Sequence, residues 1–288
     1  MTNPTNKYSR RDFIGDGALF SVGMMAMSSF GEDLLNTGMA PKPGAMPKFK
    51  LGSFEVSRLI LGSKPFWGFW HENPRQPQEY TQERRKAVMD TAAAQGITAI
   101  WSPGYREWIA LWNEYKEAGG KLATWIGQPD GYNGVSVEEQ ITACAKNGGK
   151  AVCVQGVNVD AAMEKKDYDK LKRWLGMIKG YGLAAGLASH QPESILKAED
   201  EGLPAEFYHL TLGVPDAFDN AARDRTLKTV QQIDKPMVVF KVFGAGRFEP
   251  KSAFPYVMKA IRPKDGLCIG VDNPQQVAEN AEFMRRLT

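Results

Sequence analysis

The chain of 288 residues carries 36 lysine and arginine residues against 33 aspartate and glutamate residues, a net charge of +3. Hydrophobic residues make up 43% and charged residues 24%, which excludes a disordered or collagen-like chain. So small a positive charge gives no reason to expect nucleic acid as a partner. After residue 50 no run of 18 uncharged apolar residues occurs, so the body of the chain is not expected to lie in a membrane.

The first forty residues have the pattern of an export signal. Ser9-Arg10-Arg11-Asp12-Phe13-Ile14 places two arginines before an apolar pair, and a mildly apolar stretch follows from Ala18 to Phe30. This order predicts a twin-arginine signal and a periplasmic or extracellular location, with a cytosolic N-terminal helix as the alternative. Residues 1–40 are then signal peptide and linker, and residues 41–288 form one domain with no membrane partner.

Apolar β-rich runs alternate with amphipathic helical stretches along that domain. A short hairpin is expected over Phe49–Ser57, and eight runs follow: Leu59–Leu61, Thr98–Trp101, Leu122–Ile126, Ala151–Val154, Leu183–Ala188, Phe207–Leu212, Met237–Val242 and Leu267–Val271. Continuously apolar strands joined by helices indicate a parallel sheet, and eight such units predict an α/β fold of the (β/α)8 TIM-barrel class. A doubly wound open sheet is the alternative, and it would have a glycine-rich phosphate-binding loop after the first strand. Leu61-Gly62-Ser63-Lys64-Pro65 does not have that pattern.

The three histidines lie on or just after predicted strands, where a TIM barrel places its chemistry. His190 ends the fifth strand, His71 follows the first strand, and His209 lies within the sixth. His71 and His190 are candidate catalytic residues, and all three histidines are candidate ligands of a divalent metal. The alternative is a buried structural histidine.

Lys241 is expected near the end of the seventh strand. A lysine among apolar residues is costly to bury unless it is paired or reaches a polar mouth. It is therefore a catalytic candidate, either as a cation facing an anionic or developing oxyanion group or as a Schiff-base amine. Pairing with a carboxylate inside the barrel is the alternative. Arg247 follows in Gly244-Ala245-Gly246-Arg247, which has the composition of an anion-binding turn and makes Arg247 a candidate cofactor-binding residue.

An aromatic segment follows the first strand. Trp67 and Trp70 lie in Phe66-Trp67-Gly68-Phe69-Trp70-His71. They could stack on a sugar substrate or cap the barrel mouth. The three cysteines, Cys144, Cys153 and Cys268, are expected to be buried and reduced, because an odd number cannot pair completely.

Both ends of the domain resemble the aldo/keto reductases. Residues 50–62, Lys-Leu-Gly-Ser-Phe-Glu-Val-Ser-Arg-Leu-Ile-Leu-Gly, are similar to that family's opening hairpin and first strand. Residues 269–280, Ile-Gly-Val-Asp-Asn-Pro-Gln-Gln-Val-Ala-Glu-Asn, are similar to its last strand and cofactor-binding helix. The resemblance implies an NAD(P) cofactor whose adenine meets Glu279 and Asn280, in a groove that ends near Asn273.

The middle of the chain departs from that family's catalytic residues. The family uses an aspartate, a tyrosine acid, a lysine and a histidine. Trp101-Ser102 stands where the aspartate is expected. Gln155 replaces the histidine and is a candidate substrate-binding residue. Tyr105 lies within one residue of the expected tyrosine and is the catalytic candidate to replace it, but without the aspartate and lysine it would be a poor acid. Gly270 and Val271 replace the residue that faces a 2′-phosphate, so NAD is at least as well favoured as NADP.

Three interpretations follow from the sequence. The first is an exported oxidoreductase that uses a nicotinamide cofactor on a small carbonyl or carbohydrate substrate. The second is a cofactor-free or metal-assisted sugar isomerase, lyase or hydrolase, in which His71, His190 and Lys241 converge beside Trp67 and Trp70. The third is a non-catalytic sugar-binding barrel, with an aromatic mouth but no convergent titratable groups.

Overall fold

A computed structural model describes residues 45–67, 80–132, 134–214 and 216–288. The predicted signal, His71 and Trp70 lie outside these residues. Among the described residues, no helix has the length and apolar character that crossing a membrane requires.

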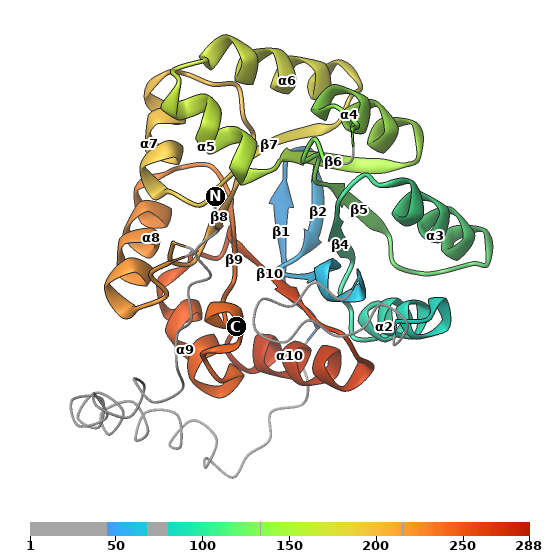
Figure 1. The fold of residues 1–288 in the computed structure, drawn as a ribbon. Coiled ribbons are helices and arrows are strands. Elements are labelled where there is room, and N and C mark those ends of the chain that lie inside the picture. The colour runs from blue at the N-terminus through green and yellow to red at the C-terminus, as the bar shows by residue number, and fades with distance from the viewer. Residues whose placement is uncertain (1–44, 68–79, 133, 215) are drawn as a thin grey trace, which may run out of the picture. The chain divides into compact units, whose positions relative to one another are not determined.

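Eight parallel strands close into a barrel, so the predicted (β/α)8 TIM barrel is confirmed (Figure 1). The strands are β3 (Leu59–Gly62), β4 (Ala99–Ser102), β5 (Thr124–Gly127), β6 (Gly149–Val154), β7 (Ala184–Ser189), β8 (Phe207–Thr211), β9 (Met237–Phe240) and β10 (Gly266–Gly270). Closure comes from pairing of β10 with β3, in which Leu267 stands opposite Leu59 and Gly270 opposite Gly62. An open sheet is thereby excluded.

Helices surround the barrel on its outer face (Figure 1). They are α2 (Gln82–Ala94), α3 (Arg106–Glu117), α4 (Val137–Lys146), α5 (Gly156–Glu164), α6 (Tyr168–Gly180), α7 (Pro192–Asp200), α8 (Asn220–Gln232), α9 (Pro250–Ala260) and α10 (Pro274–Arg286). The sequence did not predict α5. Its buried face is carried by Gly156, Val159, Ala162 and Met163, and two of these are too small to produce an apolar stripe.

Alternate strand residues point into the barrel and build its inner core. Ile60, Trp101 and Cys153 belong to this inner cluster, whereas their neighbours Leu61, Ile100 and Val152 pack outward against the helices. This alternation is the period of two of a strand. All three cysteines are buried and free, as predicted, and burial raises the pKa of the Cys144 and Cys268 thiols to about 12.

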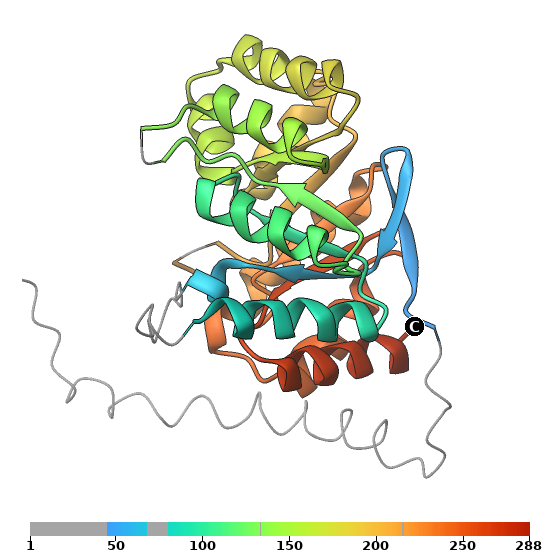
Figure 2. The same cartoon turned by 90° about the vertical axis from the view of Figure 1, so that its right-hand side faces the viewer.

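The predicted hairpin is present as β1 (Lys48–Leu51) and β2 (Phe54–Ser57). Phe49, Leu51 and Val56 are buried in the inner cluster, so the hairpin closes one end of the barrel. Figure 2 shows the hairpin at the end opposite the short 3-10 helix η1 (Lys64–Trp67), which follows β3. The carboxyl ends of the strands therefore remain as the place for a site.

A buried carboxylate ties the amino ends of the strands together. Asp265, just before β10, accepts hydrogen bonds from the Met237 N–H at 3.0 Å and from Arg262 Nε and Nη2 at 2.8 Å each. Its own carbonyl accepts a hydrogen bond from Arg58 Nε at 2.9 Å. This network joins the hairpin segment to β9 and β10, far from the mouth.

Candidate functional site

His190 and Asp160 form a pair at the carboxyl end of β7. His190 Nδ1 lies 3.1 Å from Asp160 Oδ2, and the His190 backbone N–H donates to the same oxygen at 3.0 Å. Ser189 Oγ donates to the other carboxylate oxygen, Asp160 Oδ1. The carboxylate thus favours the tautomer with a proton on Nδ1, which leaves Nε2 as the acceptor of a substrate proton. This is the geometry of an oriented general base.

The pair lines a groove of about 840 Å³. Its walls come from α5, from the start of α7 and from the loop after β8, and they include Asp160, His190, Gln191, Glu193, Ser194 and Asp216. The groove is of a size that holds a small metabolite.

Two lysines lie at the same mouth. Lys64 begins η1 after β3, and Lys241 directly follows β9. Among the described residues neither ammonium has a carboxylate within ion-pair distance. Burial of the half-exposed Lys241 side chain, with the positive charge of Lys64 added to it, lowers its pKa to about 8. Desolvation also lowers the pKa of Lys64, although that side chain keeps an exposed part. The alternative interpretation, an ion pair of Lys241 with a carboxylate inside the barrel, is therefore not found in the described part of the chain.

Lys241 does not continue its strand, contrary to the predicted range Met237–Val242. Its φ of +56° lies in the left-handed region, which ends β9 at Phe240. Ala245 in the same loop has a φ of +60°. Each such non-glycine residue costs about 1–3 kcal/mol, and such residues cluster at functional sites.

His209 lies on β8 inside the barrel, as predicted, between two aromatic rings. The ring centroids of Trp101 and Phe240 are 3.8 Å and 4.2 Å from that of His209, and Phe240 also contacts His190 at 6.0 Å. Burial, followed by the charges of Lys64 and His190, holds the pKa of His209 well below its usual range. Neither ring nitrogen has a hydrogen-bond partner among the described protein atoms. His209 is therefore a neutral group at the floor of the mouth.

The Tyr105 hydroxyl is hydrogen-bonded to a carboxylate. It precedes α3 as its N-cap residue, and its hydroxyl donates a hydrogen bond to Asp130 Oδ2. Desolvation and this bond raise the pKa of Tyr105 well above its usual value. A hydroxyl with a raised pKa gives up its proton less readily, so these contacts make Tyr105 a weaker general acid toward a substrate.

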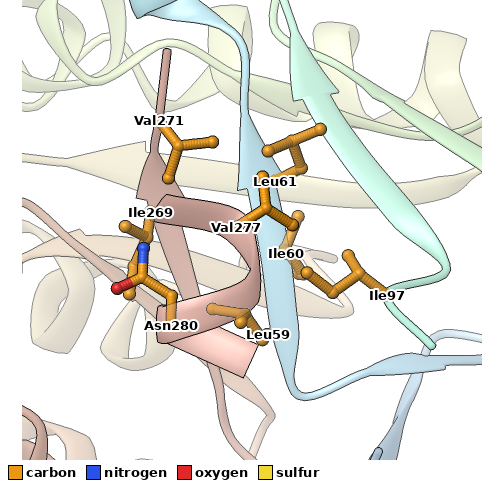
Figure 3. A pocket seen from close by; sticks show the side chains of 8 residues that line it. All are labelled: Leu59, Ile60, Leu61, Ile97, Ile269, Val271, Val277 and Asn280. Carbon is orange, nitrogen blue, oxygen red and sulfur yellow. The ribbon is translucent and has the colours of Figure 1, made fainter. Parts of the chain in front are cut away.

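The residues that the resemblance connects with adenine lie on α10. Glu279 is exposed and accepts a hydrogen bond from Gln275 Nε2 at 2.8 Å. Asn280 is buried, and Figure 3 shows its side chain beside Ile269 and Leu59 in a small cavity between α10 and the barrel wall. Asn273 caps α10 by accepting from the Gln276 N–H at 2.9 Å. The residues that line the groove at His190 do not include any of these three.

The remaining candidates are dispersed around the mouth. Arg247 stacks on Phe218, with 5.2 Å from its guanidinium carbon to the ring centroid. Trp67 has one face covered by the Arg85 guanidinium at 4.2 Å. Gln155 precedes α5, and its buried Oε1 has no hydrogen-bond partner in the described structure. The described part of the chain holds no cluster of three histidine, cysteine, aspartate or glutamate side chains able to bind a metal.

The sequence did not assign a role to Asp160, Lys64 or Asp130. Each could be located after a strand, but their partners come from elements far apart in the chain. Asp160 was the hardest to recognise, because it lies on the unpredicted helix α5.

Solved structures provide the comparison for this fold. Two structures of aldo-keto reductases from Pseudomonas aeruginosa align with TM-scores of 0.63 and 0.59, at 15% and 17% identity. They cover 87% and 83% of this chain and 99% and 94% of the other. The chain has the fold of the aldo-keto reductases. The holo form of an aldo-keto reductase from Bacillus halodurans aligns with a TM-score of 0.57 at 11% identity, over 83% of this chain and 90% of that one. No protein-family model and no curated protein matches the sequence.

Gly156 makes room for His190 and gives a first test of the pair. A Cβ on Gly156 would lie 2.8 Å from His190 Nδ1 and 2.9 Å from Cε1, closer than atoms pack. We expect Gly156→Ala to turn the ring away from Asp160, which NMR of the histidine ring nitrogens would report as a loss of the Nδ1–H bond. In the matched control, Gly176→Ala on α6, the new Cβ meets no atom within 4 Å, so the histidine spectrum is expected to stay unchanged. An unaltered spectrum in Gly156→Ala would contradict the described ring position.

Proposed function

We propose that this barrel is an enzyme that acts on a small anionic carbonyl compound by proton transfer. The observation that carries the proposal is the oriented His190–Asp160 pair at the same mouth as two lysines without carboxylate partners among the described residues. An oriented histidine in a groove, with two lysines at the same end of the barrel, favours catalysis over passive sugar binding, and the lysines lie outside the groove lining. The class is that of the cofactor-free isomerases and lyases.

The residues have separable tasks. A carbonyl oxygen develops negative charge when a proton leaves the neighbouring carbon, and a lysine ammonium stabilises that charge. His190 Nε2 accepts the proton, while Asp160 holds the ring and stabilises the imidazolium that forms. An anionic substituent such as a carboxylate would meet the second ammonium, which has no ion pair among the described residues although the charge of Asp130 acts on Lys64 and that of Asp216 on Lys241. Carbohydrate-derived acids have these groups.

The fold favours a second candidate, a nicotinamide-dependent oxidoreductase. The residues of this chain, however, fit the cofactor poorly. Asn280 is buried against the barrel wall, and the Tyr105 hydroxyl is engaged by Asp130. If NAD(P) binds, it would supply the hydride. His190 rather than Tyr105 would then be the oriented group that donates the proton to the carbonyl oxygen. Glu279 remains exposed on α10.

Export through the twin-arginine route is part of the proposal. It rests on Arg10, Arg11 and the Phe13-Ile14 pair, and it places the enzyme in the periplasm or outside the cell. Fractionation of cells that produce the full chain and its Arg10→Lys/Arg11→Lys variant tests it: the variant is expected to stay in the cytosol, and equal export of both proteins would refute the signal.

Pyruvate in D2O provides the test of the catalytic proposal, because it carries a carbonyl, a carboxylate and exchangeable methyl protons. We expect the purified protein to accelerate deuterium incorporation at the methyl group, observed by proton NMR, without added nucleotide. In parallel, NADH and NADPH are titrated by their fluorescence. Exchange without nucleotide binding supports the cofactor-free enzyme. Nucleotide binding without exchange overturns it in favour of the oxidoreductase, and the absence of both overturns both candidates.

A further inference from the structure

The backbone fixes Lys241 at the mouth more firmly than a flexible loop would. Its left-handed conformation is followed by a tight turn, in which the Gly244 N–H donates to the Lys241 carbonyl at 2.8 Å. Phe240, the preceding residue, packs on both His209 and His190. The turn therefore places the lysine directly after the aromatic floor that also contacts the base.

The Lys241 side chain is half-buried among groups that act on its charge in opposite directions. Its Nζ lies 5.5 Å from the centroid of the Phe218 ring, a cation–π contact that favours the ammonium. Asp216, which lines the groove with His190, is the carboxylate whose charge favours the ammonium, whereas burial and Lys64 oppose it more strongly. A lysine pKa of about 8 leaves a substantial neutral fraction near neutral pH, as nucleophilic amines require.

We propose that Lys241 Nζ forms an imine with the carbonyl carbon of a 2-oxo acid. This inference rests on the proposed function and names its covalent step and its substrate class. The neutral amine adds to the carbonyl carbon, so that a C–N bond forms and the amine proton moves to the oxygen. The carbinolamine then loses its hydroxyl as water, with a proton taken from the solvent, and a protonated imine remains. No oxidant or reductant is consumed.

The imine gives the other residues defined roles. Its positive nitrogen accepts the electron pair of a neighbouring C–H bond, and His190 Nε2 accepts the proton, which yields an enamine. Lys64 lies at the same mouth, and its ammonium has no ion pair with a carboxylate among the described residues. It is the group that binds the carboxylate of the 2-oxo acid. Reprotonation and addition of water reverse the sequence and release the amine.

Reductive trapping tests the imine. The full-length protein is incubated with pyruvate and sodium cyanoborohydride, and mass spectrometry follows a gain equal to pyruvate minus one water plus two hydrogen atoms. We expect the adduct on Lys241 by peptide mapping, and an initial trapping rate that rises as the pH increases through about 8, since only the neutral amine attacks. Lys64→Met removes a positive charge that lowers the Lys241 pKa. In this variant the pH midpoint of the trapping rate is therefore expected to lie higher than in the parent protein.

Three variants distinguish the outcomes. Lys241→Met and Lys241→Arg are expected to lose both the adduct and the methyl exchange, and the arginine variant keeps the positive charge while removing the nucleophilic amine. Lys48→Met, on the exposed face of β1 at the opposite end, is the control and is expected to behave as the parent protein. Methyl exchange that persists in Lys241→Arg, or an adduct on another lysine, overturns the imine but not the proposed function. The absence of exchange in the parent protein overturns the proposed function, and the imine with it.

Discussion

His190→Gln is expected to lower the rate of pyruvate methyl exchange by about 10²–10⁴-fold, the usual contribution of a positioned acid or base. Glutamine keeps the approximate volume and can still hydrogen-bond Asp160, but it cannot accept a proton near neutral pH. Asp160→Asn is expected to have a similar effect for a different reason. The amide can donate to Nδ1, and a proton is then favoured on Nε2, where it blocks the base.

Asp200→Asn on the exposed part of α7 is the matched control for the charge change, and its exchange rate is expected to equal that of the parent protein. Circular dichroism of each variant verifies the fold. A His190→Gln protein that exchanges pyruvate protons at the parental rate would remove His190 from the mechanism and leave Lys241 with a different base. Asp160 also accepts hydrogen bonds from the Ser189 hydroxyl and from the His190 backbone N–H. The stability of Asp160→Asn is therefore measured beside its exchange rate.

The barrel could be predicted because its signals are local and repeated. Each strand is a short apolar run, and most helices carry a clear stripe; in α6, for example, Leu171, Trp174, Leu175 and Ile178 are buried at helical spacing. Helix α5 escapes the same reasoning because glycine and alanine form part of its buried face. The sequence places Lys241 inside a strand because nothing in Phe240-Lys241-Val242 indicates a left-handed residue. That conformation belongs to a local turn in which the Gly244 N–H donates to the Lys241 carbonyl, and the apolar run does not reveal this turn.

The candidate site was predictable as a location but not as a set of contacts. The sequence indicates that His190 and Gln155 lie at the ends of strands and Lys241 near the end of another, and the barrel then brings them to one end. It cannot indicate that Asp160, 30 positions before His190, orients the ring, or that Asp130 takes the Tyr105 hydroxyl. Resemblance to a family pointed to Tyr105 and Asn280, whereas the contacts of this chain favour His190 and Lys241.

Asp265→Ala is expected to lower the free energy of unfolding by about 3–5 kcal/mol, the cost of removing one partner from a buried ion pair. The side chain is fully buried and accepts hydrogen bonds from the Met237 N–H, from the Arg262 backbone N–H and from two guanidinium nitrogens of Arg262. Its loss leaves the Met237 N–H without an acceptor in the interior and the guanidinium without its counter-charge. Urea unfolding followed by tryptophan fluorescence measures the change, provided that the transition stays cooperative.

Asp234→Ala is the matched control, because Asp234 also pairs with a basic residue, Lys264, at 2.7 Å, but does so in full contact with solvent. Water already screens that pair, so its removal is expected to change the urea midpoint little. Equal midpoints for Asp265→Ala and Asp234→Ala would show that the buried carboxylate does not hold the amino ends of β9 and β10 together. Because this network lies at the end of the barrel away from His190, Asp265→Ala should weaken folding while the folded fraction keeps the parental rate of pyruvate exchange. The two ends of the barrel would then be separable, one stabilising the fold and the other carrying the chemistry.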